Sequence, residues 1–140
     1  TYVWAAIAEH GKKSPGAGFY IGLGVDGVSF GGGLHHPEKD DLTKARRAIM
    51  KHGKELHALL DSKEFKEYWG GKLEGDKNKV LPPEFKEAAK QEPLIAHKGW
   101  HYWHTGTVAD VTRDDLMEWV VAHFKAGQAV NEFFSDSLAS

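Results

Sequence analysis

The sequence of 140 residues contains no cysteine, and this absence narrows the chemistry that the chain can perform. Without a thiol there is no disulfide scaffold, no thiolate zinc site and no cysteine nucleophile. The chain also lacks a run of about 18 or more apolar residues, so the sequence predicts no membrane span. The formal net charge is only −2 with the nine histidines counted as neutral. Such a balance gives no general attraction for nucleic acid.

What remains is the composition of an ordinary globular protein. Hydrophobic residues make up 41% of the chain and charged residues 27%, unlike the composition of disordered chains. We predict one soluble, cytoplasmic domain over residues 1–140. The chain begins at Thr1 and enters the apolar segment 2–8 at once, without the features of a signal peptide. Since a domain rarely begins inside a strand, we expect that an N-terminal segment is missing.

Four short segments have the composition of β-strands. Three of them, residues 2–9, 19–23 and 28–32, follow one another closely along the chain. Asp26-Gly27 lies between the second and the third, and Asp-Gly between apolar runs is a strong hairpin signal. The fourth segment, residues 100–104, is aromatic and is bounded by glycines. These segments predict an antiparallel sheet.

Apolar residues at helical spacing predict two long helices. The first begins near Asp40 or Asp41, either of which could cap it, and runs to Leu60 with a bend at Gly53. The second follows Thr112 and Asp115 as caps, carries an apolar stripe to Phe134 and leaves residues 135–140 frayed.

Two shorter helices are predicted between the long ones. One covers residues 65–69, with Asp61 and Glu64 at its start and Gly70-Gly71 at its end. The other covers residues 84–91, and the polar segment 72–83 is predicted to be a loop or a short edge strand. The fold class is therefore α+β: an antiparallel sheet packed by one long helix, a C-terminal helix and short helices.

Two glycine patterns suggest ligand sites. Residues 22–27 match G-x-G-x-x-G, but a dinucleotide site requires a helix next and here another apolar strand follows. We interpret this match as a hairpin. Residues 31–33 are three glycines inside a predicted strand, which indicates a bulge or a close backbone approach. The approaching group could be the long helix or a ligand, so Gly32 is a candidate ligand-binding residue.

The histidines are the candidates for catalysis. His97, His101 and His104 have a spacing that would gather three imidazoles on one face of a helix, as a metal site requires. On the predicted strand, however, His97 and His101 point to one face and His104 to the other, so we predict no metal and no cofactor. His35 and His36 could join His101 in space, although adjacent strand residues point to opposite faces. His35 and His101 are the candidate general bases.

Basic residues suggest a site for a small anion. Arg46 lies on the first long helix, and Lys79 and Lys98 lie further along the chain. Arginine binds phosphate or carboxylate in a bidentate manner. The alternative is an ordinary solvated surface. The basic residues are interspersed with acidic ones, which argues against a nucleic-acid groove.

The order of several motifs resembles the bacterial and fungal family named domain of unknown function 2461. The resemblance implies an α+β fold and no known activity. The family's Arg-Asp-x-Arg-Phe motif is absent, so any function that it carries cannot be transferred. The matching segments are Gly16-Ala-Gly-Phe-Tyr-Ile21, Phe30-Gly-Gly-Gly-Leu34 with Pro37, Leu42 to Ile49 with Arg46, Leu59 to Phe65, Leu73-Glu-Gly75 with Lys77, Lys79 and Pro82-Pro83, and Lys98 with Trp100-His-Tyr102.

Three classes of function stay open from the sequence. The first, which we favour from the sequence, is a ligand-binding or interaction domain with a small anion site near Gly32, Arg46, Lys79 and Lys98. The second is a hydrolase that uses a histidine general base, so whether the chain is an enzyme is undecided. The third is a structural subunit without a ligand. The ligand and the oligomeric state cannot be predicted from these residues.

Overall fold

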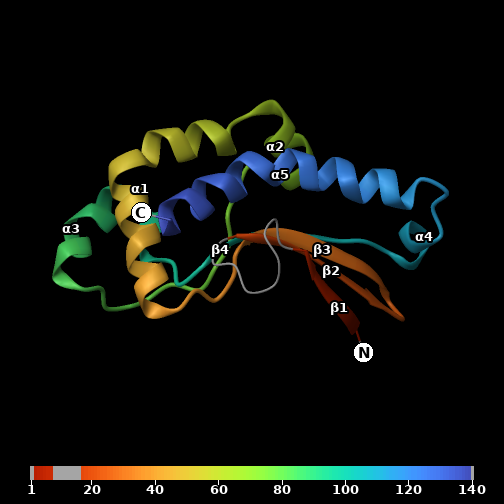
Figure 1. Cartoon of the computed structure of the whole chain (residues 1–140), viewed down its shortest axis with the longest axis horizontal. Helices are drawn as coiled ribbons and strands as arrows, with labels where there is room; N and C mark the ends of the chain where they lie inside the picture. The colour runs from red at the N-terminus through yellow and green to blue at the C-terminus, as the bar shows by residue number, and fades with distance from the viewer. Residues whose placement is uncertain (1, 8–16, 140) are drawn as a thin grey trace.

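The structure of the protein is a computed structural model that describes residues 2–7 and 17–139 (Figure 1). Four strands form one antiparallel sheet in the order β1 (Tyr2–Ile7), β2 (Gly18–Gly24), β3 (Gly27–Leu34) and β4 (Trp100–Thr105). The predicted strands are confirmed, apart from residues 8 and 9 of the first, which lie outside the described residues, and the α+β class is confirmed. Gly24 pairs with Gly27 across the predicted hairpin turn, and Gly27 has φ +140°, which glycine adopts readily. The G-x-G-x-x-G match is thus a hairpin.

Helices cover one side of this sheet. The helical elements among the described residues are α1 (Lys39–Leu60), α2 (Lys63–Trp69), α3 (Pro83–Gln91), the 3₁₀ turn η1 (Pro93–Ala96), α4 (Val108–Val111) and α5 (Leu116–Leu138). Figure 1 shows α1, α2 and α5 on the same side, and α5 packs against both β3 and α1. The bend predicted at Gly53 is confirmed by a kink at the preceding residue, His52, where φ is −125° and ψ is 27°.

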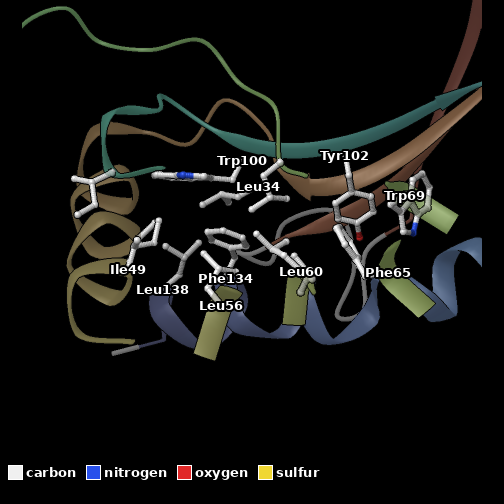
Figure 2. Packing of buried hydrophobic residues seen from close by; sticks show 14 of the residues in the cluster. Leu34, Ile49, Leu56, Leu60, Phe65, Trp69, Trp100, Tyr102, Phe134 and Leu138 are labelled. Carbon is white, nitrogen blue, oxygen red and sulfur yellow. The ribbon is translucent and has the colours of Figure 1, made fainter. Parts of the chain in front are cut away.

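The core lies between the sheet and these helices. Phe30, Trp100 and Tyr102 point from the sheet into it and are at most 1% exposed. Trp100 stacks on Phe134 of α5, with ring centroids 5.5 Å apart (Figure 2). The Tyr102 hydroxyl donates to Asn131 Oδ1 at 2.6 Å, which satisfies a polar group inside the core. The hydrophobic residues of α1 and α5 therefore hold the helix layer on the sheet.

Several predicted helix caps are wrong. Asp40 and Asp41 lie inside the first turn of α1, after the N-cap Glu38. The cap of α2 is Ser62 rather than Asp61, since the Ser62 hydroxyl accepts from Phe65 N at 3.3 Å. Each carboxylate still lies near a helix N-terminus, where its charge is favourable.

The start and the end of α5 also differ from the prediction. Thr112 ends the short helix α4, which was not predicted and which begins with a capping box formed by Thr107 and Asp110. Asp115 is the N-cap residue of α5 but its side chain makes no capping hydrogen bond. The predicted fraying after Phe134 is wrong as well, because α5 continues to Leu138, which is buried against the core.

The three glycines of β3 confirm the predicted close approach, and the approaching group is the protein itself. A Cβ at Gly31 would lie 2.1 Å from Trp103 Cε3, and one at Gly33 would lie 2.2 Å from Trp100 O. A Cβ at Gly32 would lie 2.5 Å from the Tyr102 hydroxyl oxygen. Side chains at these positions would therefore prevent β4 and its aromatic residues from packing on β3.

Candidate active site

A cleft lies where β3 ends and β4 begins. The two histidines that follow β3 line one wall, His101 of β4 lines the next, and the segment 74–76 lines the third. Its volume is about 620 Å³. We call this site the histidine cleft. Its lining residues are His35, His36, Glu74, Gly75, Asp76, Lys98, Gly99 and His101.

Backbone hydrogen bonds fix the acidic segment against β4. Glu74 N donates to His101 O at 2.7 Å, and His101 N donates to Glu74 O at 2.9 Å. Lys98 N donates to Asp76 O at 2.6 Å. The segment 72–83 thus contains two isolated bridges, one at Glu74 and one at Lys77, rather than a full edge strand. Both carboxylates are held beside the histidines by the backbone.

Gly75 makes this close packing possible. A Cβ at Gly75 would lie 2.2 Å from Gly99 O and 3.0 Å from His97 Nδ1. Both distances are too short for a side chain, and the nearest atom belongs to a backbone that cannot rotate away. The segment 74–76 can therefore approach β4 only with glycine at its centre.

Three imidazole rings meet in the cleft. The ring centroids of His35 and His36 are 4.1 Å apart, and those of His35 and His101 are 5.2 Å apart. His35 and His36 lie beyond Leu34, the last residue of β3, and His36 has φ +48°. The alternation of a strand does not apply there, so both rings can face the same site. The hypothesis that His35 and His36 join His101 is thus supported by these distances.

The imidazoles of His35 and His101 favour the neutral form. Burial lowers the pKa of His101 below its ordinary value, while Glu74 and Asp76 partly oppose this shift. Burial also lowers the pKa of His35, and the neighbouring His36 and His101 lower it further. A neutral imidazole beside carboxylates can accept a proton, and the carboxylates stabilise the imidazolium that results.

Arg46 is inside the protein and does not line the cleft. It is 4% exposed, and its guanidinium donates to Ile95 O at 2.8 Å, Asn78 Oδ1 at 2.6 Å and His97 O at 3.0 Å. These acceptors lie in η1, in the loop that follows the cleft segment 74–76, and in the turn between η1 and β4. The structure therefore accounts for Arg46 as a support of the cleft wall, without a ligand.

The other predicted anion-binding residues are also dispersed. Gly32 is buried below the Tyr102 hydroxyl, and Lys79 is exposed outside the lining of the histidine cleft. Only Lys98, of the four candidates, lies in the cleft. The anion site formed by Gly32, Arg46, Lys79 and Lys98 together thus remains a prediction that this geometry does not support.

The predicted division of the histidines between two faces is found for His101 and His104. His101 lies in the cleft, whereas His104 packs against Phe30 and Trp119 on the helix side. His97 is buried, and its Nδ1 has no hydrogen-bond partner in the described part of the chain. Among residues 2–7 and 17–139, no group of three or more potential ligands is arranged to hold a metal ion.

The sequence matches one known protein family over nearly its whole length. The model of the family described as Conserved hypothetical protein (DUF2461) matches residues 1–133. The chain belongs to the DUF2461 family. No curated protein and no solved structure matches the chain. The description of DUF2461 names no activity, so a function for this member has to be argued from the histidine cleft.

Sequence reasoning missed Glu74 and Asp76 in this DUF2461 member. They lie in a polar loop whose residues resemble any solvated turn, and they reach His101 only through long-range backbone pairing. One signal was present: a single glycine lies between two carboxylates, although α3 and η1 separate it from the histidine-containing strand β4. The structure also contains no helix long and apolar enough to cross a membrane among its described residues.

Proposed function

We propose that the histidine cleft is the active site of a hydrolase that acts on a small polar substrate, with His101 as general base. One observation carries this proposal: His35 and His101, whose ring centroids are 5.2 Å apart, line the same cleft as the two acidic residues Glu74 and Asp76. His101 is half-buried and favours the neutral form, as a base requires.

Each polar group has a role in the proposed reaction. The His101 imidazole takes a proton from a water molecule, whose oxygen forms a bond to the electrophilic carbon of the substrate. The bond to the leaving group then breaks, and the imidazolium returns its proton to the leaving group. Glu74 and Asp76 stabilise the imidazolium in the interval, because both favour its charged form. Lys98 stabilises negative charge that develops on the substrate oxygen.

The alternative of a domain that binds a small anion has less support. It would rely on Lys98 alone among the predicted cations, next to two carboxylates. A structural subunit without a ligand would not need three imidazoles and two carboxylates around one opening. The cytoplasmic location of the protein stays a prediction from the sequence.

The test is hydrolysis of chromogenic substrates by the purified chain. We expect turnover of p-nitrophenyl acetate, or of p-nitrophenyl β-D-glucopyranoside, with a rate that rises with pH as His101 loses its proton. His101→Asn should lower the rate by about 10²-fold or more. His52→Asn, which changes an exposed histidine of α1, is the matched control. An unchanged rate in His101→Asn, or no turnover of either substrate by the unaltered chain, would contradict the proposal.

A further inference from the structure

The charge of the histidine cleft does not favour an anionic ligand. Glu74 and Asp76 contribute two negative charges and Lys98 one positive charge, which leaves a formal charge of −1 when the imidazoles are neutral. A phosphate or carboxylate group placed there would meet a carboxylate on either side of Gly75. Like charges at such short range are repulsive. The charge of the cleft therefore argues against a phosphate or carboxylate ligand.

The lining also requires a ligand that forms many hydrogen bonds. Among the described residues that line the cleft, every side chain is histidine, acidic or lysine, and the remaining residues are glycine. A carboxylate accepts hydrogen bonds at both oxygens, and a neutral imidazole offers one donor and one acceptor. Adjacent hydroxyl groups match this set of donors and acceptors, whereas an apolar molecule would leave it unsatisfied.

Aromatic residues border the cleft on the same face of the sheet. Tyr20 pairs with Gly31, which pairs with Trp103, so the three residues form one row across β2, β3 and β4. The pair of Gly33 and His101 lies two residues away from the pair of Gly31 and Trp103. Because side chains alternate along a strand, both pairs are on the same face of the sheet.

One ring of this row, that of Tyr20, approaches a histidine of the cleft. The Tyr20 ring centroid is 6.2 Å from that of His35. The Trp103 indole lies on Gly31, since a Cβ there would be 2.1 Å from Cε3, and the residue is 37% exposed. An exposed aromatic surface next to a hydrogen-bonding cleft suits a ring with an apolar face and polar edges.

We propose that the histidine cleft binds a neutral sugar ring. The hydroxyl groups of the ring bind Glu74, Asp76 and the imidazoles, and its C–H face lies toward Tyr20 and Trp103. This inference rests on the proposed function, because the sugar would be the substrate of the same His101. It extends that function by naming the substrate class as a glycoside or a sugar ester.

The experiment is a two-dimensional NMR titration of the full chain with methyl glycosides of glucose, galactose, mannose, xylose and N-acetylglucosamine, and separately with inorganic phosphate. We expect at least one glycoside to shift the amide signals of residues 35–36, 74–76 and 98–103. Asp76→Asn should weaken that binding about tenfold, because an amide of the same shape replaces a charged acceptor. Trp103→Phe, which keeps an aromatic ring on Gly31, should weaken it less. Asp26→Asn, in the exposed hairpin turn, is the control for charge and should change nothing.

The outcomes separate this inference from the proposed function. The proposal of a sugar ligand is contradicted if no glycoside shifts these signals. It is also contradicted if phosphate shifts them and Lys98→Gln abolishes that shift. In that case, turnover of p-nitrophenyl acetate that depends on His101 would still support the proposed hydrolase. If glycosides bind but His101→Asn leaves every turnover unchanged, the hydrolase is wrong while the sugar site stands.

Discussion

Glu74 and His101 exchange two backbone hydrogen bonds, with N···O distances of 2.7 and 2.9 Å. This pair joins a polar loop to β4 at the position where the cleft opens. The backbone therefore determines the distance between the Glu74 carboxylate and the His101 imidazole. Since Glu74 raises the pKa of His101 against the effect of burial, the proton affinity of the imidazole depends on this attachment.

The first prediction concerns that proton affinity. Burial holds the pKa of His101 below its ordinary value, and removing a carboxylate should lower it further. Glu74→Gln keeps the shape and the backbone pairing, so the change in pKa reports the charge alone. The measurement is a pH titration of the histidine ring signals by NMR. A rise in the pKa of His101 in Glu74→Gln would contradict this account. The control is Glu67→Gln on the exposed face of α2, which should leave the pKa of His101 unchanged.

The second prediction concerns Gly75. Gly75→Ala should lower the free energy of unfolding by about 1–3 kcal/mol, because the new Cβ would lie 2.2 Å from Gly99 O. Urea unfolding measures the loss, and hydrogen exchange should show faster exchange at the amides of Glu74 and His101. Gly53→Ala is the control, since a Cβ at Gly53 meets only the Glu92 carboxylate at 3.4 Å. Equal stability of the two variants would show that the close approach at Gly75 is not required.

The third prediction concerns Arg46. Arg46→Lys should destabilise the chain by about 2–4 kcal/mol, because an ammonium group cannot reach the three acceptors that the planar guanidinium reaches. The equivalent change Arg47→Lys affects an exposed residue paired with Glu84 and should cost much less, because a surface ion pair contributes little to stability. Both values come from urea unfolding. If the two variants lose the same amount, the hydrogen bonds of Arg46 contribute little.

Local signals predicted most of the fold. The Asp-Gly turn, the aromatic strand 100–104 and the periodicity of α1 and α5 each depend on neighbouring residues, which a single sequence displays. The caps were less well predicted because adjacent residues compete for one position. Ser62 has the hydroxyl that reaches Phe65 N, whereas Asp61 is one residue too early. Sequence alone does not distinguish the two.

The candidate site depended on information that local patterns do not contain. His35 and His101 were named from their chemistry, but their carboxylate neighbours come from a distant loop. Arg46 was predicted to bind a small anion, with a solvated surface as the alternative, and arginine is in fact seldom buried. Its burial requires three acceptors, Ile95 O, Asn78 Oδ1 and His97 O, that meet only after η1 and the segment near Asn78 have packed against α1. Long-range pairing thus determines which polar residues meet.

The last prediction concerns stability against pH. His123 is 5% exposed and lies among the rings of Phe30, Tyr68 and Trp69. Burial lowers the pKa of His123 below that of the unfolded chain, and the carbonyl of Trp119 opposes this only partly. The unfolded state then binds more protons than the folded state. Stability is therefore complete above a pH of about 6.5 and falls as the pH drops through that value.

His123→Phe should remove much of this dependence, because phenylalanine fills the same aromatic site and cannot take a proton. We expect the slope of unfolding free energy between about pH 5 and pH 6.5 to decrease, by at most about 1.4 kcal/mol per pH unit for one proton. Urea unfolding at several pH values measures the slope. His52→Asn, which alters an exposed histidine, should retain the slope of the unaltered chain. If His123→Phe retains it too, the acid sensitivity comes from other histidines whose pKa burial lowers, such as His97, which is also buried.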